Sequence, residues 1–163
     1  MGNTKLSYPE KRTWFIIYDD NKKDHWSWNR LIEHFAELNW SKLNLGIAFY
    51  GRKYPDAEEI GQHWDGPMSH HPTSSALLYS DIHSLLFDVS QSWQKDWDDQ
   101  AKVPFLKSNE GIIVYDDERS IRQKANFIIN EGLAGVIIWE LGCDQINGQH
   151  PLLNAVAHIL KRS

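Results

Sequence analysis

Side chains suited to binding a polar ligand follow several predicted strands of this sequence. Tyr18, Tyr50 and Arg52 carry hydrogen-bond donors, and Trp139 adds a flat apolar ring with a single N–H. Each of them stands at or just past the end of a strand-like run. Because the carboxyl ends of parallel strands meet at one edge of a sheet, where α/β folds place their ligands, we expect these side chains to share one rim.

The other reactive side chains are more typical of structural roles. Glu140 could serve as an acid, but its position on a strand predicts a structural salt bridge or the opposite face. Asp98-Asp99 and Asp116-Asp117 are typical of turns and helix caps. Cys143 has no paired His that would make it a nucleophile, and as the single cysteine it excludes an internal disulfide framework. His70-His71 lack a third ligand at a recognisable spacing, so no metal site is expected.

The segment GLAGVIIWELGCD, residues 132–144, contains the strand that is expected to present Trp139. Its apolar run is bounded by glycine, which predicts a strand over 135–139 that is buried on both faces. The preceding residues 120–130 have helical spacing, with Asp117 as the N-cap and Gly132 at the end. A helix, a glycine stop and a buried strand make half of a βαβ repeat, so a parallel sheet is predicted.

Further elements extend this alternation. A short strand is predicted over Trp14–Tyr18, a helix over Arg30–Leu38, and a second buried strand over Leu43–Phe49 that ends at Gly51. Near the C-terminus another helix begins at Pro151, a residue suited to the first helical position. Three parallel strands cannot close a barrel, and a complete eight-fold β/α barrel needs ~250 residues. The chain is therefore a small open α/β domain or part of something larger, and the pattern favours the second.

The stretch from Lys53 to about Asn109 interrupts the alternation. Proline and glycine punctuate it, a helix is predicted near Tyr79–Trp93, and short extended pieces are predicted at Val103–Phe105 and 112–115. These pieces indicate an antiparallel excursion. Long insertions inside a strand–helix alternation are usually functional.

Composition narrows the class of protein. The 163 residues are 41% hydrophobic and 24% charged, which is typical of a globular chain. The formal charge of −5, with no run of Lys or Arg, argues against a nucleic-acid surface. No apolar run approaches the ~20 residues of a membrane span. The opening residues are polar, so the sequence predicts no signal peptide there.

Four segments resemble glycoside hydrolase family 18, the chitinases and chitinase-like proteins. In chain order they are LNLGIAFYGR, WDDQAKVPF, the YDDERSIRQKA run and GLAGVIIWELGCD. The resemblance implies an α/β fold made of the last strands and helices of a (β/α)8 TIM barrel, with an α+β chitinase insertion between the last two strands. Residues 1–52 and 110–163 would form the partial barrel, and residues 53–109 the insertion. The piece WFIIYDD is similar to the family's sixth strand, with Ile16 or Ile17 in place of the usual Met.

The resemblance also implies a substrate and a mechanism. Family 18 enzymes act on β-linked N-acetylglucosamine polymers such as chitin and retain the anomeric configuration, because the sugar's own acetamido group replaces the second carboxylate. Trp139 would form the floor under the sugar, Tyr18 would bind the acetamido group, and Asp19 would contact the same sugar. Tyr50 and Arg52 would line the groove. No metal or organic cofactor is implied, and the parent protein would be secreted or at the cell surface.

The sequence departs from the family at its catalytic motif. The spaced Asp residues that end in the general-acid Glu are absent, and the run Asp96–Asp99 has neither the spacing nor a following Glu. The chain is therefore expected to be the C-terminal portion of such a hydrolase and to be inactive alone. Two alternatives stay open: a non-catalytic carbohydrate-binding or interaction protein derived from the same barrel, and a self-contained α/β domain with an unrelated ligand.

Each candidate site residue also has a structural interpretation. Trp139 could fill the core at the end of its strand, and Arg52 could form a surface ion pair. Tyr18 and Asp19 could simply end a strand and begin a turn. The exposure and the partners of these side chains distinguish a binding role from a structural one.

A partial barrel has open sheet edges, and such edges pair readily with another chain. We therefore expect a homodimer or strand exchange through the edge near Trp14–Tyr18. Light scattering over a wide range of concentration measures the mass, and a monomer at every concentration would contradict this expectation.

Overall fold

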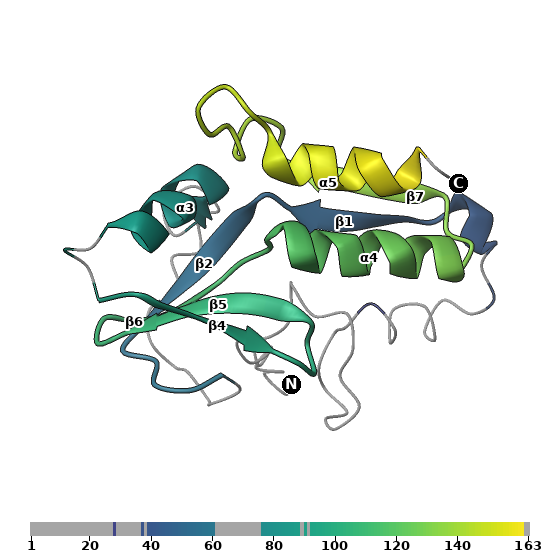
Figure 1. Ribbon diagram of the computed structural model, residues 1–163. Coiled ribbons are helices and arrows are strands. Elements are labelled where there is room, and N and C mark those ends of the chain that lie inside the picture. Colours follow the sequence, from purple (N-terminus) through teal and green to yellow (C-terminus); the bar gives the residue numbers. More distant parts are fainter. Residues whose placement is uncertain are drawn as a thin grey trace, which may run out of the picture.

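The computed structural model describes residues 28, 37, 39–60, 76–88, 90 and 92–161 of the chain. These residues form a two-stranded parallel sheet, a five-stranded antiparallel sheet and helices beside them (Figure 1). A short 3-10 helix, η1 (Trp40–Lys42), leads into the first strand. The strand predicted over Trp14–Tyr18 lies outside the described residues, as does most of the helix predicted over Arg30–Leu38.

The parallel sheet joins β1 (Asn44–Ala48) to β7 (Gly135–Trp139), in a register that sets Ala48 opposite Trp139. β7 confirms the strand predicted over 135–139, and β1 lies within the strand predicted over Leu43–Phe49. Helix α4 (Glu118–Asn130) precedes β7 and helix α5 (Pro151–Leu160) follows it; the two helices lie side by side along the parallel pair (Figure 1). The predicted alternation of helices with parallel strands is therefore observed.

Only one face of the parallel pair is covered in the described part of the chain. Leu45, Ile47, Val136 and Ile138 alternate along the two strands and pack with side chains of α4 and α5. The intervening Ile137 is 60% exposed. The prediction that β7 is buried on both faces is wrong, because helices cover one face while the alternate side chains point away from them.

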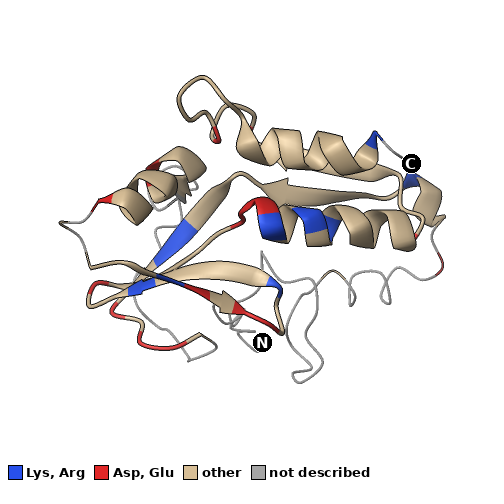
Figure 2. Cartoon of the chain, in the orientation of Figure 1, with Lys and Arg blue, Asp and Glu red and all other residues tan. Residues whose placement is uncertain are grey.

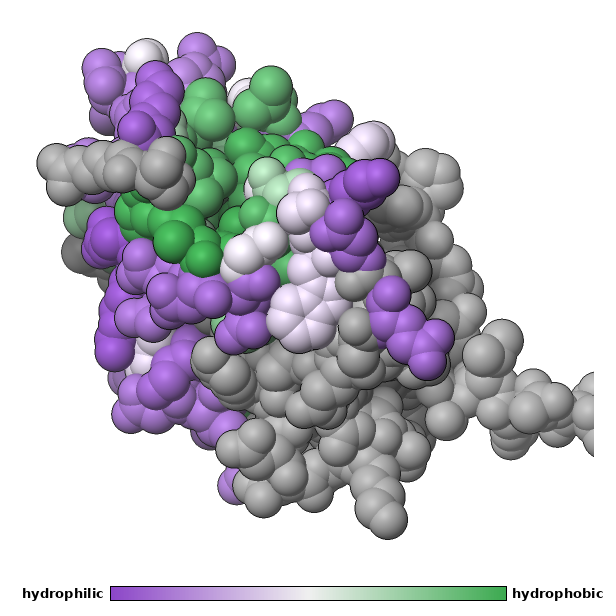
Figure 3. Space-filling view, turned by 90° about the vertical axis from the view of Figure 1, so that its right-hand side faces the viewer, coloured by the Kyte–Doolittle hydropathy of each residue, from purple (hydrophilic) through white to green (hydrophobic). Residues whose placement is uncertain are grey.

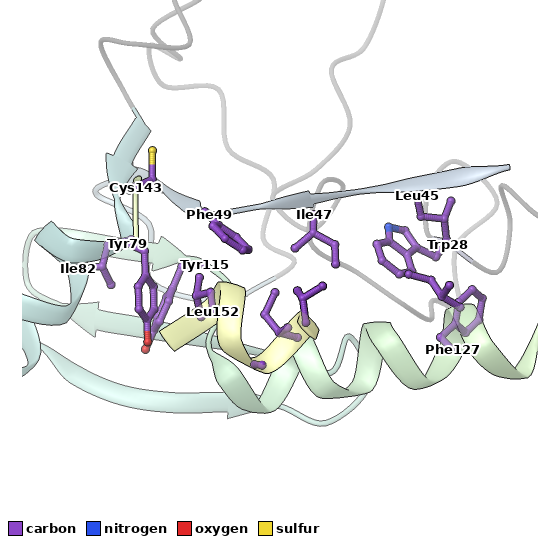
Figure 4. Close-up of a cluster of buried hydrophobic side chains, with 14 of the residues drawn as sticks. Trp28, Leu45, Ile47, Phe49, Tyr79, Ile82, Tyr115, Phe127, Cys143 and Leu152 are labelled. Carbon is purple, nitrogen blue, oxygen red and sulfur yellow. The ribbon is translucent and has the colours of Figure 1, made fainter. Parts of the chain in front are cut away.

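The main core lies between the sheets and the helices (Figure 4). At one end the ring of Trp28 lies 5.8 Å from that of Phe127, and at the other end Phe49 packs near Tyr79 and Tyr115. Burial of each large apolar side chain contributes about 1.5–3 kcal/mol. This cluster therefore fixes the helices to both sheets at once.

The antiparallel sheet lies in the chain between β1 and α4 and has the strand order β3-β2-β6-β5-β4. Its β5 and β6 correspond to the extended pieces predicted at Val103–Phe105 and 112–115. In chain order the strands are β2 (Tyr50–Pro55), β3 (Ala76–Leu78), β4 (Gln94–Asp98), β5 (Val103–Ser108) and β6 (Gly111–Val114).

The prediction that a strand ends at Gly51 is wrong, because Gly51 lies within β2. The chain bends at Phe49 and continues as β2, so Tyr50 and Arg52 belong to the antiparallel sheet. A Cβ at Gly51 would lie 2.5 Å from the Cδ1 atom of Ile82 and 2.9 Å from the Val114 carbonyl oxygen. Glycine stands here because of this close approach, which the sequence pattern did not distinguish from a stop signal.

Helix α3 (Tyr79–Phe87) is shorter than the helix predicted near Tyr79–Trp93. Asp88 follows its last residue, and the Asp88 carboxylate accepts hydrogen bonds from the backbone N–H and the hydroxyl of Ser90 at 2.9 and 2.5 Å. Such a local side-chain turn competes with helical hydrogen bonding and ends the helix.

The predicted ends of α4 are confirmed. Asp117 is the N-cap and accepts from the backbone N–H of Ser120 at 3.0 Å, while the Ser120 hydroxyl accepts from the backbone N–H of Asp117 at 2.9 Å. This reciprocal pair is a capping box. Gly132 follows the C-terminal end with a φ of +67°, the left-handed conformation that glycine adopts without strain.

A buried ion pair joins the residue before the N-cap of α4 to the second turn of the helix. Lys124 Nζ lies 2.5 Å from Asp116 Oδ2, and both side chains are 1% exposed or less. The Ser120 hydroxyl donates to Asp116 at 2.7 Å, and the ring of Trp28 lies 5.4 Å from the Lys124 ammonium. Burial raises the pKa of Asp116 and lowers that of Lys124, while each partner opposes the shift of the other. Figure 2 shows the acidic start of α4 followed by basic residues.

Hydrophobic side chains also reach the surface on the side where α4 and α5 end (Figure 3). Ile129 of α4 is 39% exposed, and α5 has the sequence PLLNAVAHIL, which is apolar on most sides. A helix that is hydrophobic all round is typical of one buried within a larger fold.

We predict that Lys124→Met lowers the free energy of unfolding by about 3–5 kcal/mol, because it leaves Asp116 buried without its cation. Burial raises the pKa of Asp116 above its unfolded value of about 3.9, so its contribution to stability is present below that pH and is lost as the pH rises. The loss of unfolding free energy caused by Lys124→Met should therefore be smaller at pH 4 than at pH 7. Urea unfolding at the two pH values measures both effects.

The control for this prediction is Lys53→Met. Lys53 pairs with Glu110 at 2.6 Å, but the two side chains are 32% and 57% exposed. Exposed pairs contribute about 0–1 kcal/mol. Equal losses in the two variants would contradict the assignment of a special role to the buried pair.

Candidate functional site

The predicted rim is formed where β1 and β7 end. Trp139 is the last residue of β7 and lies opposite Ala48, and the Phe49 N–H donates to the Trp139 carbonyl at 2.8 Å. Tyr50 and Arg52 follow at once in β2. The structure therefore brings the backbone of Tyr50 next to that of Trp139, although about ninety positions separate the two residues in the sequence, and Arg52 follows two residues further along β2.

Tyr18 and Asp19 lie outside the described residues. Their predicted contacts to the sugar stay predictions. The part of the rim that can be described consists of Tyr50, Arg52 and Trp139 with their neighbours.

Trp139 is largely open to solvent. Its side chain is 64% exposed, and Ile137 and Leu141 on either side of it are 60% and 66% exposed. A tryptophan that filled the core would be buried, so this alternative is wrong for the described chain. An exposed strip of large apolar side chains is typical of a surface that binds something. The peptide bond between Trp139 and Glu140 is cis.

Arg52 is half-buried and lies close to two tyrosines. Its guanidinium carbon is 5.9 Å from the centre of the Tyr50 ring. Burial raises the pKa of Tyr54, and the positive charge of Arg52 opposes that shift. The Nε atom of Arg52 is buried and has no hydrogen-bond partner among the described residues. A buried N–H without an acceptor is costly, so this group is suited to donating to a bound ligand.

The reactive side chains next to the rim have the following positions. Glu140 is exposed, and the described part of the chain offers it no ion pair, contrary to the salt bridge that was considered. The Cys143 thiol is buried with its sulfur 4.0 Å from a Glu140 carboxylate oxygen, and burial raises its pKa. A thiol with a raised pKa is a poor nucleophile.

The two pairs of aspartates, Asp98-Asp99 and Asp116-Asp117, contain residues with different roles. Asp98 accepts from the backbone N–H groups of Gln100 and Ala101 at 2.9 Å, which confirms its role in a turn. Asp117 is the helix cap that was predicted. Asp116, in contrast, forms the buried ion pair of α4, so the expectation of a turn or cap is wrong for that residue.

Sequence reasoning missed two groups near the rim. The Tyr79 hydroxyl donates to a Glu118 carboxylate oxygen at 3.0 Å, and burial followed by the charge of Glu118 raises the Tyr79 pKa. In the loop after β7, the buried Asp144 accepts from the Leu153 N–H at 3.0 Å and contacts the His150 ring at 3.1 Å. No periodicity or motif marks such long-range pairs, which only the tertiary fold brings together.

The fold places an exposed tryptophan at the end of a parallel strand, where α/β barrels bind their ligands. The profile of the family described as "Glycosyl hydrolases family 18" matches residues 8–144, most of the chain. The chain therefore belongs to glycosyl hydrolase family 18, the family that the four sequence segments indicated.

Named relatives agree with this assignment. The chain is 31% identical over 127 residues to "Putative chitinase 2" of Margaritifera margaritifera and 30% identical over 122 residues to "Probable chitinase 2" of Drosophila melanogaster. These alignments cover 76% and 66% of this chain but only 27% and 25% of the relatives. The chain therefore spans about a quarter of their length and is similar to a part of a chitinase-like protein.

Solved structures share the fold. The human protein YKL-39, described as a pseudo-chitinase with retained chitooligosaccharide binding properties, superimposes with a TM-score of 0.75 at 22% identity. That superposition covers 90% of this chain and 44% of the other. The chitinase ChiW of a Paenibacillus species gives a TM-score of 0.74 at 28% identity, over 93% of this chain and 14% of that one.

The described part of the chain shows neither of two other kinds of site. No helix within it has both the length and the apolar character needed to cross a membrane. Within the same residues, His, Cys, Asp and Glu nowhere gather in threes that could hold a metal ion.

We predict that Trp139→Ala changes the free energy of unfolding by less than about 1 kcal/mol, because the side chain is largely exposed. Phe49→Ala, at a neighbouring residue that is fully buried, should cost about 3–5 kcal/mol. Urea unfolding followed by circular dichroism compares the two variants. A loss of several kcal/mol in Trp139→Ala would restore the core interpretation.

Proposed function

We propose that this chain is the C-terminal portion of a chitinase-like protein and that its rim binds β-linked N-acetylglucosamine oligosaccharides. The observation that carries the proposal is the exposed Trp139 ring at the end of β7, whose backbone is bonded to Phe49 just before β2, together with the Arg52 Nε–H on β2, which has no acceptor among the described residues. An indole offers a flat apolar face for the C–H side of a pyranose, and the guanidinium offers donors for its hydroxyls. A flat apolar face and hydrogen-bond donors are what a sugar-binding site requires.

Individual roles follow from this arrangement and from the family. Trp139 forms the floor under one sugar ring, and Arg52 donates from its buried side to a hydroxyl oxygen. Tyr50, which lies against the Arg52 guanidinium, lines the wall. Tyr18 and Asp19 bind the acetamido group and a hydroxyl of the same sugar. Neither metal nor organic cofactor takes part.

In the proposed parent protein the barrel is completed by further strands. Residues 1–52 and 110–163 belong to that barrel, and residues 53–109 form an α+β insertion between its last two strands. An antiparallel sheet between β1 and β7 supports an insertion at this place in the chain, and its first and last strands in chain order, β2 (Tyr50–Pro55) and β6 (Gly111–Val114), extend beyond residues 53 and 109. The parent hydrolyses chitin with retention through the acetamido group of the substrate. Since chitin is an extracellular polymer, the parent is secreted or displayed at the cell surface.

The chain alone binds but does not hydrolyse. Its sequence lacks the Asp-rich run that ends in the general-acid Glu, and proton donation to the leaving oxygen is part of the reaction. A second candidate function is a carbohydrate-binding protein that has lost catalysis. The description of YKL-39 as a pseudo-chitinase with retained chitooligosaccharide binding properties supports this candidate.

Titration of N-acetylglucosamine oligomers into the purified chain, followed by calorimetry and by tryptophan fluorescence, tests the proposal. We expect saturable binding that Trp139→Ala weakens by about tenfold or more, because the sugar covers apolar surface of the indole and a loss of about 1.4 kcal/mol is a tenfold change in affinity. Arg52→Lys should also weaken binding, because lysine keeps the charge but lacks the Nε donor.

The matched control is Trp97→Ala. Trp97 lies in β4, at the far edge of the antiparallel sheet from β2 and β3, and the Arg119 guanidinium stacks 3.6 Å from its ring centre. Its removal should leave sugar binding unchanged. A folded chain that binds no oligomer refutes the proposed site, and release of shorter sugars from the oligomers refutes the expected inactivity.

A further inference from the structure

Helix α3 begins where two segments of the rim meet. The backbone N–H of Tyr79 donates to the Phe49 carbonyl at 3.2 Å, and the N–H of Ser80 donates to the Cys143 carbonyl at 3.0 Å. The N-cap residue, Leu78, has no side chain that could take these donors. The first turn of α3 therefore satisfies its free N–H groups with carbonyls from the end of β1 and from the loop after β7.

These bonds extend to Trp139 itself. The Phe49 N–H donates to the Trp139 carbonyl at 2.8 Å, so Phe49 links the last residue of β7 to the first residue of α3. Cys143 provides a second link four residues beyond Trp139. The position of α3 and the position of the Trp139 backbone are thus coupled through short backbone hydrogen bonds.

The Tyr79 side chain fixes the same turn to a rigid support. Its hydroxyl donates to the Glu118 carboxylate at 3.0 Å, and its ring is 4% exposed. Glu118 is the first residue of α4 and directly follows Asp117, the N-cap. The Asp117 Oδ2 atom also lies 2.7 Å from Lys95 Nζ. Figure 4 shows Tyr79 in the core beside Phe49 and Cys143.

We infer that Tyr79 and Glu118 form a positioning pair for the rim: their hydrogen bond holds α3 in place, and α3 in turn holds the strand ends that carry Trp139 and Tyr50. The pair does not touch the ligand. The inference rests on the proposed function only for its effect on sugar binding. The coupling between the pair and the rim is a property of the free protein.

A second tyrosine provides a matched control. Tyr115 is 1% exposed, and its ring centre lies 6.4 Å from that of Tyr79. Its hydroxyl is buried without a hydrogen-bond partner in the described part of the chain. Tyr115→Phe therefore makes the same chemical change in the same core, without removing a hydrogen bond between α3 and α4.

Amide hydrogen exchange of the free chain tests the coupling. In Tyr79→Phe we expect the N–H groups of Phe49 and Ser80 to exchange about tenfold faster, because a hydrogen bond to a charged group is removed. The Ile121 N–H, which donates to the Asp117 carbonyl at 2.9 Å, should keep its rate and so report on global stability. Tyr115→Phe should change none of these rates.

Glu118 variants separate positioning from general packing. Glu118→Gln keeps an oxygen that accepts from the Tyr79 hydroxyl, so its amide exchange rates should stay near those of the unsubstituted chain. The rates of Glu118→Ala should match those of Tyr79→Phe. The double variant Glu118→Ala with Tyr79→Phe should be no worse than either single one, because both remove the same bond. Unchanged exchange at Phe49 and Ser80 in Tyr79→Phe, or equal effects of Tyr79→Phe and Tyr115→Phe, would overturn the inference.

Sugar titration adds the functional readout. We expect N-acetylglucosamine oligomers to bind Tyr79→Phe about three- to tenfold more weakly than they bind the unsubstituted chain, with the affinity of Tyr115→Phe unchanged. Unaltered affinity in Tyr79→Phe overturns the positioning role. If the unsubstituted chain binds no oligomer, the proposed function fails instead, and the exchange rates still decide whether the pair holds the rim.

Discussion

The parallel pairing of β1 with β7 is the constraint on which the rest of the structure depends. It sets Ala48 opposite Trp139 and thereby joins segments from the two ends of the described chain. Their buried side chains pack with those of α4, α5, α3 and the antiparallel sheet to form the main core. The same pairing brings the start of β2 to the end of β7, so the core and the candidate site share one set of hydrogen bonds. Loss of this register would remove both.

Local signals in the sequence predicted the parallel layer well. The capping box at Asp117, the left-handed Gly132 and the run that became β7 each depend on neighbouring residues, which a sequence displays directly. The order of strands and helices predicted that Tyr50, Arg52 and Trp139 share one rim, and the resemblance to family 18 gave each of them a role. The structure joins the end of β7 to the residue before β2, which places the backbones of Trp139 and Tyr50 next to each other.

Other features depended on contacts that a sequence does not display. Gly51 is required because Ile82 and Tyr115 approach its backbone, yet its spacing in the sequence is that of a strand stop. Asp116 stands in a pair of aspartates typical of a cap, but its charge is buried against Lys124. The exposed face of β7 depends on which elements cover the sheet. In each case a partner distant in sequence decides the outcome.

The single-residue joint at Phe49 limits how this fold can vary. Side chains along β2 alternate between the two faces of the antiparallel sheet, so the number of residues after the end of β1 decides which face carries Tyr50 and Arg52. One residue inserted at the joint would turn Arg52 to the other face, against α3. Turns elsewhere in the sheet could change length without moving the rim. Related chains that keep this site should therefore differ in the length of their other connections and not at this one.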